Sequence, residues 1–576
     1  MERIQLRIQD SCGAWRQFLQ HLTKLSFTLF FALILCGTAF AQEEIEVSGT
    51  VTSDSGESLP GVTIQLEGTQ LGTTTDMDGA YEIVVPSDGV LIFSFVGFRT
   101  LREPVDGRTT INVTLEETIA NLEELIVTGY SSQRRGDVTG AVASVDIESV
   151  QRESGASVIQ RLSGSVPGVR VETSGAPGAR STVRIRGISS FQNNDPLYII
   201  DGTPVQDSFA NWLNPNDIES IQVLKDASAA SIYGARANNG VVIIQTKKGN
   251  EGAPQVNLSL RTGVQQPTRG YDDFLIQDAL QYHEVVKRAF ENAGLDVPTN
   301  IYGDPNNPSI PEYVWPNDGV NQTNSLSQFG LTEDDYSFPN QLIMPASNGT
   351  NWWDAVFGSG MIQDYNIGVS GGGESFNYNV AFNYLDQEGT AAYHNFTRGT
   401  IRVNTEFDLG NFTIGENVSL ALDESIGAAG NGLGGEDGIL GKNILMQPIV
   451  PVRDIGGNFA SGKAVTLGNM SNPLKEAWAD RDDVSRGTTL FGNVFGRYDI
   501  IDKIQVLTRL GFNITERSFA GFNPIYPEDS EPSFLTSISE NYNNTTDWTW
   551  TNTINYIDTI AEDHNVNVIV GHEMNE

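Results

Sequence analysis

The sequence predicts a mostly β protein in three parts: a small β-sandwich, a small α/β unit, and a long antiparallel sheet. Three observations support this. The chain opens with an export signal, it has no later apolar run long enough for a membrane-spanning helix, and its second half alternates apolar and polar residues in stretches of roughly 10. Such a chain stays in the periplasm or at the cell surface, or crosses a membrane as closed β-structure, because lipid offers the backbone no hydrogen-bond partners.

The first 41 residues have the order of a secretory signal. A basic stretch precedes the apolar run from Leu25 to Cys36, and Ala39-Phe40-Ala41 forms a cleavage pattern. The run is about a dozen residues long, whereas a membrane helix needs about 20, so a transmembrane anchor is disfavoured. We expect cleavage between Ala41 and Gln42, with residues 1–41 removed.

The composition excludes several classes of function. The chain has 35 basic and 72 acidic residues, a net charge of −37, which argues against a nucleic-acid partner because phosphate binding needs clustered Lys and Arg. Both cysteines, Cys12 and Cys36, lie in the leader, so the mature chain has no disulfides or thiolate ligands. The five histidines are scattered without zinc-ligand spacing. We therefore predict no enzyme activity, no cofactor and no metal site.

Residues 42–117 are predicted to form the β-sandwich. Short alternating runs separated by turn residues are typical of this fold. These runs span residues 46–51, 61–66, 81–85, 91–95 and 111–115. The pieces Leu59–Val62, Thr75–Tyr81 and Phe95–Phe98 resemble the carboxypeptidase regulatory-like domain. That resemblance implies an accessory sandwich without catalysis.

Residues 118–136 form a connecting segment. The segment Leu122–Tyr130, which contains a short β-branched run, precedes the polar residues Ser131–Gly136, which we expect to be flexible. By pattern alone the stretch is only a strand. Its place between an exported domain and the next unit also suits strand addition to another protein.

Residues 137–249 are predicted to form the α/β unit. The runs Leu197–Asp201, Ile221–Lys225 and Val241–Thr246 indicate strands. The Ala-rich stretch Ala227–Tyr233 indicates a helix that ends at Gly234.

The order of motifs in residues 122–249 resembles the SusC/RagA family of TonB-dependent outer-membrane transporters. The resemblance identifies Leu125, Ile126, Val127, Thr128, Gly129 and Tyr130 as a TonB box. It identifies as plug-domain motif residues Arg184, Arg186, Gly187, Asp201, Gly202, Lys225, Asp226, Tyr233, Gly234, Arg236 and Gly240. It implies a plug inside a barrel in the outer membrane of a Gram-negative cell, with the N-terminal domain in the periplasm. The implied partners are TonB, a SusD-like lipoprotein and outer-membrane lipid.

Three plug arginines, Arg184, Arg186 and Arg236, have two interpretations. They are either solvated surface charges or, as the resemblance favours, partners of acidic residues on the barrel wall, because a buried charge needs pairing.

Residues 250–576 are predicted to form barrel strands, each near the roughly 10 residues that a tilted membrane strand needs. The predicted strands span residues 255–265, 362–371, 375–385, 398–409, 412–423, 488–499, 503–515, 546–558 and 564–573. Long and short connectors alternate, which is typical of extracellular loops and periplasmic turns. The first long loop contains a predicted helix, Phe274–Ala293, that could meet the lipoprotein. Trp548 and Trp550 fit an aromatic girdle or a packed core equally well.

Plugged transporters close at about 22 strands, and about nine are predicted here, so we expect an incomplete barrel from a fragment, a truncated product or a split gene. The expected function is import of a nutrient, with an oligosaccharide as first candidate and an oligopeptide as second. Loop aromatics such as Tyr313, Trp315, Trp352 and Trp353 would stack on sugar rings or pack locally. The alternatives are a siderophore-type receptor of the same fold, a surface-binding protein without transport, and a secreted enzyme, which the absence of a catalytic constellation disfavours.

Overall fold

The computed structural model describes the chain from Glu44 to its end with short gaps. The gaps are residues 54–55, 67–70, 88, 96–97, 99–100, 116–124, 129–130, 135–140, 154, 174, 190, 192–193, 206–211, 227–230, 268–273, 315–331, 339–341, 428–437, 463–466, 468–469, 527–532 and 561–563. The predicted leader, with its cleavage site at Ala41 and Gln42, lies outside the described residues. In the described part of the chain, no helix is long and apolar enough to span a bilayer. The chain divides into two compact units, and the boundary between them lies between Glu124 and Leu125.

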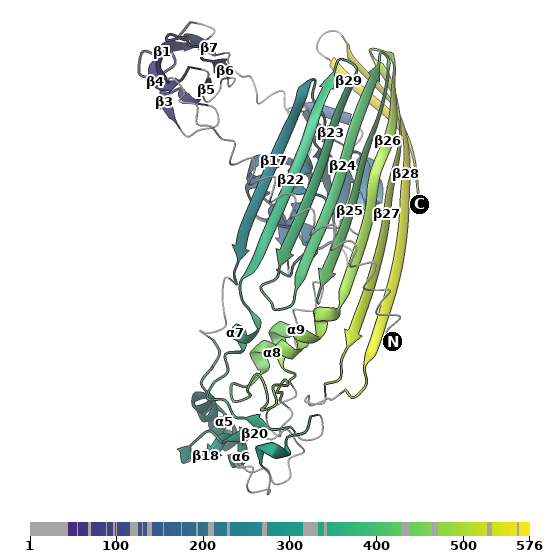
Figure 1. Ribbon diagram of the computed structural model, residues 1–576. Coiled ribbons are helices and arrows are strands. Elements are labelled where there is room, and N and C mark those ends of the chain that lie inside the picture. The colour runs from purple at the N-terminus through teal and green to yellow at the C-terminus, as the bar shows by residue number, and fades with distance from the viewer. Residues whose placement is uncertain are drawn as a thin grey trace. The chain divides into compact units, whose positions relative to one another are not determined.

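The first unit is the predicted sandwich, strands β1 to β7, most of which are labelled in Figure 1. One sheet has the order β4-β1-β7 and the other β3-β2-β5-β6. The strands are β1 (Glu44–Ser53), β2 (Thr63–Leu66), β3 (Gly72–Thr74), β4 (Ala80–Pro86), β5 (Val90–Ser94), β6 (Leu101–Pro104) and β7 (Val113–Leu115). Every second residue of β4 is buried, Tyr81, Ile83 and Val85 among them, and these side chains pack with Phe93 and Ile64 in one core. The five predicted runs are confirmed as strands.

The second unit begins with a short hairpin and the predicted α/β unit. The hairpin is β8 (Leu125–Thr128) and β9 (Ser131–Arg134). The α/β unit has a five-stranded sheet of order β10-β15-β16-β13-β14 and a separate pair β11-β12. Its elements are β10 (Val142–Ser144), α2 (Ile147–Arg152), α3 (Val158–Arg161), β11 (Val169–Glu172), β12 (Thr182–Ile185), β13 (Leu197–Ile200), β14 (Thr203–Val205), η2 (Pro215–Asp217), β15 (Ile218–Leu224), η3 (Ser231–Ala237) and β16 (Val241–Thr246).

The prediction of a helix over Ala227–Tyr233 is wrong for residues 231–233, the part of it that the structure describes. Residues 231–237 form a 3-10 stretch that Gly234 interrupts with φ 67° and ψ −153°. The break at Gly234 is where the sequence indicated an end, because glycine adopts positive φ without strain.

The second half of the chain forms a nine-stranded antiparallel sheet of order β17-β22-β23-β24-β25-β26-β27-β28-β29, seen face-on in Figure 1. Its strands are β17 (Gly252–Gln265), β22 (Gly360–Gly373), β23 (Phe376–Glu388), β24 (Asn395–Leu409), β25 (Phe412–Ile426), β26 (Val484–Ile501), β27 (Ile504–Asn523), β28 (Ser537–Ile560) and β29 (His564–Asn575). All the predicted strands are confirmed in order. Most are longer than predicted, because the pairing continues past the segments of clear alternation.

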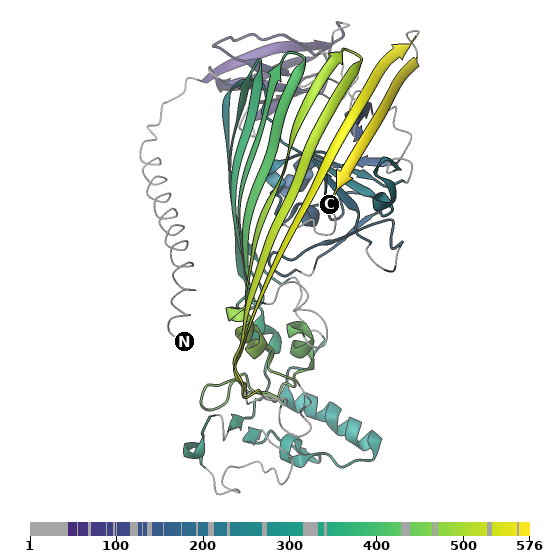
Figure 2. The same ribbon diagram turned by 90° about the vertical axis from the view of Figure 1, so that its right-hand side faces the viewer.

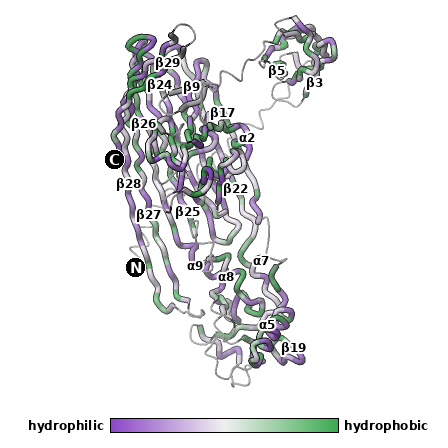
Figure 3. Tube along the Cα trace, turned by 180° about the vertical axis from the view of Figure 1, so that it is seen from behind, coloured by the Kyte–Doolittle hydropathy of each residue, from purple (hydrophilic) through white to green (hydrophobic). Residues whose placement is uncertain are grey.

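Among the described residues, one face of the sheet carries exposed apolar side chains and the other carries buried polar ones. Leu258 is 65% exposed and Val570 is 65% exposed, although both are large and apolar. Asn383 and Arg398, which point to the opposite face, are 1% and 2% exposed. The alternation of colours along the strands is visible in Figure 3, and Figure 2 shows the α/β unit against one face of the sheet. This distribution is the reverse of a soluble sandwich and fits a sheet with lipid on its apolar side.

The tryptophans of β28 lie on the apolar face. Trp550 is 43% exposed, and Ile554, on the same side of the strand, is 51% exposed. Of the two interpretations of Trp548 and Trp550, the structure therefore favours the girdle over the packed core.

Two long connections at one end of the sheet fold together into what we call the loop body, at the bottom of Figure 1. It contains α5 (Ala279–Ala293), α6 (Thr299–Tyr302), β18 (Gly303–Asp304), β19 (Asn307–Pro308), β20 (Tyr313–Val314), η5 (Glu333–Asp335), β21 (Met344–Pro345), α7 (Trp352–Val356), α8 (Ile439–Leu445), α9 (Pro473–Ala479) and η7 (Asp480–Asp482). Its core combines Tyr302, Met344 and Trp352 from the first connection with Met446 and Val450 from the second.

The predicted loop helix begins later than expected. Asp278 caps α5 by accepting a hydrogen bond from the backbone N–H of Gln281, so the helix starts at Ala279 and not at Phe274.

Candidate functional site

The candidate site is the interface between the α/β unit and the polar face of the nine-stranded sheet. Two buried clusters of charged and polar side chains lie there, and each joins residues more than 150 positions apart in the chain. The first cluster is built around Asp201 and the second around Arg161.

The first cluster depends on a tight turn between β13 and β14. Ile200 pairs with Thr203, so Asp201 and Gly202 form a two-residue connection. Their φ angles are 48° and 79°. Positive φ at both positions is typical of the type I′ hairpin turn, which Asp-Gly favours. A Cβ on Gly202 would also lie 1.9 Å from Nη1 of Arg509, so a larger residue there would displace the end of the Arg509 side chain.

The Asp201 carboxylate joins the α/β unit to the sheet. It accepts hydrogen bonds from the backbone N–H of Thr246 at 2.9 Å and from its hydroxyl at 2.7 Å. From the sheet, Arg402 lies 3.1 Å from the same carboxylate, and Asn417 donates to it. Arg402 is 2% exposed, so this is a buried ion pair. The Asp-Gly turn therefore both shapes the hairpin and holds the interface.

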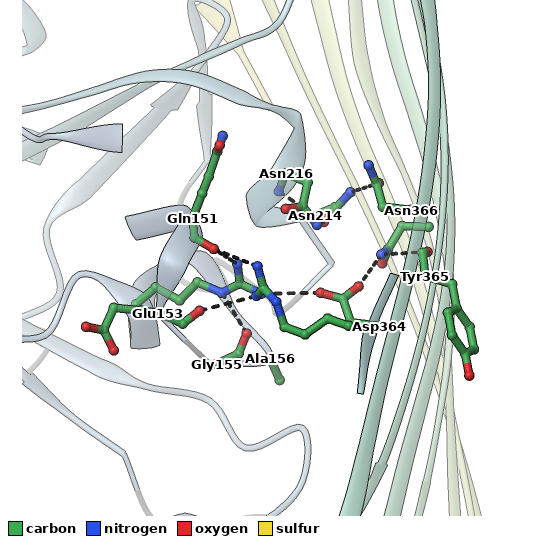
Figure 4. A network of polar contacts seen from close by, with 12 residues as sticks. Gln151, Glu153, Gly155, Ala156, Asn214, Asn216, Asp364, Tyr365 and Asn366 are labelled. Carbon is green, nitrogen blue, oxygen red and sulfur yellow. Dashed lines mark hydrogen bonds and ion pairs between the residues drawn. The ribbon is translucent and has the colours of Figure 1, made fainter. Parts of the chain in front are cut away.

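The second cluster is drawn in Figure 4. Arg161, at the end of α3, donates from Nε to the carbonyl of Gly155 at 2.8 Å, and its Nη2 lies 3.4 Å from Oδ2 of Asp364 on β22. The other oxygen of Asp364 accepts from Asn383 on β23 at 2.7 Å. Arg398 on β24 donates to the carbonyl of Ala156 at 3.1 Å.

In this second cluster, arginines from both sides of the interface surround the Asp364 carboxylate, and backbone carbonyls accept from them. Burial, and then repulsion by Arg261 of β17, lower the pKa of Arg161 to about 10, while Asp364 opposes the shift. Arg161 therefore remains charged at neutral pH. Arg261 itself donates to the carbonyl of Gln151 at 2.8 Å. Removing one partner of such a buried pair leaves an uncompensated charge, which is far more destabilising than loss of a surface pair.

Apolar contacts also cross the interface, in three clusters. Ala156 of the α/β unit packs in a cluster with Ile362, Leu385 and Phe396, and Ala176 packs in another with Val356 and Ala391. Trp212 of the α/β unit packs against Phe491 of β26 with ring centroids 4.8 Å apart, and Ala421 of β25 joins the same cluster. The other buried residues of that cluster belong to the α/β unit itself. The polar part of this interface can separate at modest cost, since water replaces lost polar partners.

The expected pairing of the plug arginines with the barrel wall is wrong for two of the three. Arg184 pairs with Asp195 and Arg186 pairs with Asp226, both within the α/β unit. Arg236 does pair with the sheet, through Glu573 of β29 at 2.6 Å. The error arises because sequence order does not show which acid a side chain can reach.

The remaining predicted motif residues have local structural roles. The carboxylate of Asp226 accepts from the backbone N–H of Ala141 at 2.8 Å, and this bond, followed by Arg186, lowers the pKa of Asp226. Lys225 donates to the carbonyl of Pro167 at 2.9 Å. Tyr233 is buried, and burial raises its pKa. The glycines adopt positive φ. Their values are 101° at Gly187, 67° at Gly234 and 86° at Gly240.

The TonB-box segment is only partly described. Leu125–Thr128 form β8, while Gly129 and Tyr130 lie outside the described residues. The expectation that the residues after it are flexible is wrong for Ser131–Arg134, which form β9 and pair with β8.

Sequence reasoning missed the sheet's side of the interface. Arg398, Thr400, Arg402 and Asn404 alternate along β24, and all are buried. The sequence did contain a signal for this face. Arg398 and Arg402 lie four positions apart on a strand long enough to cross a membrane, and charged residues on such a strand must face away from lipid.

Comparisons with known proteins agree with this architecture. The model of the TonB-dependent receptor plug domain matches residues 134–241, and that of the carboxypeptidase regulatory-like domain matches residues 47–127. TonB-dependent receptor P39 of Formosa agariphila is 30% identical over 94% of this chain and 48% of its own length. TonB-dependent receptor SusC of Bacteroides thetaiotaomicron is 31% identical over 66% of this chain and 34% of its own length.

Among solved structures, the RagAB peptide importer in its open-open state has 28% sequence identity and a TM-score of 0.61. The match covers 78% of this chain and 48% of that one. The chain thus spans about half the length of these relatives.

Proposed function

Because the chain belongs to the SusC/RagA family of TonB-dependent receptors, we propose that it takes part in the energy-coupled import of a nutrient across the outer membrane. In this proposal TonB binds the segment Leu125–Tyr130 and pulls on the plug, the α/β unit that follows it. The energy comes from the inner-membrane proton-motive force. A SusD-like lipoprotein covers the loop body and delivers the cargo.

The observation that carries the proposal is the polar interface between plug and sheet. A plug that must move and return cannot be fixed by a large apolar core. The Asp201–Arg402 and Arg161–Asp364 pairs hold it instead, with carbonyl contacts beside them. These contacts hold the plug in position while the interface excludes water. Once a pulling force lets water enter the interface, water molecules replace the lost hydrogen-bond partners.

The two faces and two ends of the sheet support an outer-membrane location. The exposed apolar face suits lipid. The connections at one end are short, as between Gly373 and Phe376 or Leu409 and Phe412, whereas the loop body occupies the other. By the usual sorting of loops in such barrels, the loop body is extracellular, and the N-terminal sandwich is periplasmic.

The cargo in this proposal is a soluble nutrient oligomer, an oligosaccharide or an oligopeptide. Of the loop aromatics that suggested sugar stacking, Tyr313 and Trp352 are 7% and 4% exposed and pack locally. The ring of Trp353 packs tilted against that of Phe357, with centroids 4.3 Å apart, and Trp315 lies outside the described residues. The likeness to the RagAB peptide importer favours the oligopeptide.

The alternatives are a siderophore-type receptor and a surface-binding protein that does not transport. The first would share plug and barrel, but the regulatory-like extension and the identity to SusC favour the SusC branch. The second is distinguished by experiment.

The test is uptake by cells that carry a receptor with this sequence and its lipoprotein partner. Labelled oligosaccharides and oligopeptides are supplied, and accumulation is measured with and without a proton gradient. We expect gradient-dependent uptake that Val127→Pro abolishes, because proline removes a main-chain donor from β8. Binding without uptake would support the surface-binding protein, and gradient-dependent uptake of ferric chelates alone would support the siderophore receptor.

A further inference from the structure

A pocket lies where the strands of the sheet meet the loop body. It is lined by residues 354–359, which run from α7 towards β22, and by residues 388–395, which join β23 to β24. Ile426 at the end of β25 and Arg481 of η7 complete the lining. The pocket has a volume of about 570 Å³, within the range of roughly 300–1,000 Å³ that small-molecule sites have.

The alternation of side chains places this pocket on the apolar side of the sheet. Glu388 lies an even number of positions after Phe382 on β23, so both project from the face on which Phe382 is 41% exposed. By the same rule Asn395 shares the face of Ile401 on β24, which is 48% exposed. Gln387 projects from the opposite face, where it accepts from the backbone N–H of Gly178, and it is not among the described residues that line the pocket. The pocket therefore opens on the side that suits lipid.

The alternation also gives the height of the pocket above the apolar band. Tyr384 follows Phe382 on this face of β23, and aromatic rings in such positions mark the membrane interface. Glu388 lies about 13 Å further along the strand, or about 10 Å along the membrane normal for a strand tilted by roughly 40°. The polar zone of a phospholipid layer adds only about 5–8 Å to the hydrocarbon. A phospholipid head group beside Tyr384 ends below the pocket, whereas a longer saccharide head group reaches it.

The lining is rich in hydrogen-bond acceptors. Asp354 and Glu388 are exposed carboxylates. His394 is 5% exposed, and its Nδ1 lies 2.7 Å from the carbonyl of Ala392 and donates to it. Burial lowers the pKa of His394, so the ring is neutral and its Nε2 is an acceptor. Within the described residues, neither this Nε2 nor Oδ1 of Asn395 has a hydrogen-bond partner, although both atoms are buried.

Such a lining calls for a ligand that donates several hydrogen bonds. Two carboxylates disfavour an anionic group, because like charges repel. A divalent cation is also disfavoured, since no three His, Cys, Asp or Glu side chains in the described part of the chain are grouped to hold one. The hydroxyl groups of a sugar each donate one hydrogen bond, and they also accept from a donor such as Arg481, whose side chain is 31% exposed.

Tyr393 adds a flat apolar surface to the pocket. Its φ is 64°, a conformation that bulky residues rarely adopt, and its side chain is 44% exposed. Strain of this kind persists only where the surrounding structure fixes the residue, and it is frequent at ligand-binding sites. An aromatic ring beside carboxylates and an amide suits a sugar, which has both hydroxyl groups and apolar C–H surfaces.

We propose that this pocket binds the saccharide head group of an outer-leaflet glycolipid whose acyl chains lie against the apolar face of β23 and β24. The proposal rests on the proposed outer-membrane location, with the loop body outside the cell. It goes beyond import, because cargo would pass on the opposite face of the sheet. A free oligosaccharide offers the same hydroxyl groups, but the apolar face directly below the pocket favours a sugar that is joined to acyl chains.

Three probes distinguish these sources. The full chain in detergent is titrated with lipopolysaccharide that carries its core sugars, with lipid A that lacks them, and with the core oligosaccharide released from lipid A. Native mass spectrometry measures the bound fraction of each. We expect the complete glycolipid to bind at least about tenfold more tightly than either part, because it alone contacts both the pocket and the apolar face.

Two pocket variants test the assigned residues. Glu388→Gln removes a charged acceptor, and Tyr393→Gly removes the ring while it relieves the positive φ, so the fold is retained. We expect each variant to weaken binding of the complete glycolipid about tenfold and to leave binding of lipid A unchanged. Glu516→Gln is the matched control. Glu516 pairs with Thr488 on the same face of the sheet and is not among the described lining residues, so its substitution should change neither affinity.

Three results would overturn the proposal. They are equal binding of the complete glycolipid and lipid A, equally tight binding of the free oligosaccharide, and affinities that either pocket variant leaves unchanged or that Glu516→Gln lowers as much. Failure of the outer-membrane location has a different signature. A chain that does not become heat-modifiable on folding into lipid vesicles would overturn the location and this inference together. A heat-modifiable chain without preference for the core sugars would overturn this inference alone.

Discussion

At the scale of single residues, Asp201 has two roles that are normally separate. Its backbone makes the first position of a type I′ turn, with φ 48°, and its carboxylate holds Thr246 and Arg402 together. Asp-Gly after an apolar run is a strong hairpin signal, although the strand predicted here, Leu197–Asp201, included Asp201 itself. The sequence does not predict Arg402 as the partner, which is 201 positions away.

Substitution of Asp201 should separate the two roles. Asp201→Asn keeps a residue that tolerates positive φ but removes the charge, whereas Asp201→Ala loses both. We expect Asp201→Ala to destabilise the interface by about 3–5 kcal/mol, because Arg402 is left buried and unpaired. Asp201→Asn should cost less. Hydrogen exchange of the Thr246 amide is the measurement, since that amide bonds to Asp201.

The matched control is Asp106→Ala in the sandwich, an exposed aspartate with φ 46°. It should leave exchange at Thr246 unchanged. Equal exchange in the Asp201→Ala variant and the unmodified protein would contradict the assigned role of the carboxylate.

A second residue-scale prediction concerns pH. Burial, followed by repulsion from Asp483 and Glu476, raises the pKa of Asp480 in the loop body from 3.8 to about 6. The folded state therefore binds an extra proton between these values, and the contribution of Asp480 to stability falls as pH rises through that window. Above it, the buried charge opposes folding.

The Asp480→Asn variant should remove this dependence. We expect its loop body to resist protease at about pH 8 as well as at about pH 5, whereas the unmodified loop body is more readily cleaved at the higher value. The same loss of resistance with pH in Asp480→Asn as in the unmodified protein would show that another group is responsible.

At the scale of elements, alternation decides which side of each strand meets lipid. The predicted strands are confirmed because period-2 patterning survives over their whole middle parts, as from Phe376 to Tyr384. Their ends could not be predicted, since beyond the lipid both faces of a strand become polar. The 3-10 stretch at Ser231–Ala237 was missed for a different reason: the packing of Tyr233 and Ala237 into a core overrides the helix propensity of alanine.

A charge placed on the apolar face should reveal its contact with lipid. Phe382 is 41% exposed at the middle of β23, and Leu409 is 64% exposed at the end of β24. We expect Phe382→Arg to cost about 2–4 kcal/mol and Leu409→Arg about 0–1 kcal/mol, because the penalty falls towards the membrane surface. The measurement is the fraction of heat-modifiable protein after folding into lipid vesicles. Equal losses would mean that the face does not contact lipid as described.

At the scale of the whole molecule, the sequence predicts the order of parts but not how they contact one another. Local patterns determine the sandwich, the plug strands and the sheet strands. The pairing of Arg161 with Asp364, or of the two loop connections with each other, depends on positions far apart in the chain. The expectation that Arg184 and Arg186 would reach the sheet is wrong because Asp195 and Asp226 lie nearer.

The shared core of the loop body predicts that its two connections unfold together. Trp352 is 4% exposed, and its indole N–H donates to the carbonyl of Gln447 at 3.1 Å. We expect Trp352→Ala to cost about 3–5 kcal/mol and to admit protease to both connections. Limited proteolysis followed by mass spectrometry detects the cuts. Trp353→Ala is the control and should change little, since Trp353 is only half-buried. Cuts confined to the first connection would show that the two fold independently.

The loop body also acts as a brace across one rim of the sheet. It leaves the sheet at the end of β17 and returns at β22, then leaves again at the end of β25 and returns at β26. The apolar core that the two connections share thus ties together two places separated by β23 and β24. These strands cannot spread or curl further at that end unless the core breaks, whereas the opposite end is joined by tight turns. The loop body therefore limits the curvature of the sheet at this end. If the strands separate further there, the loop body must move with them as one rigid unit.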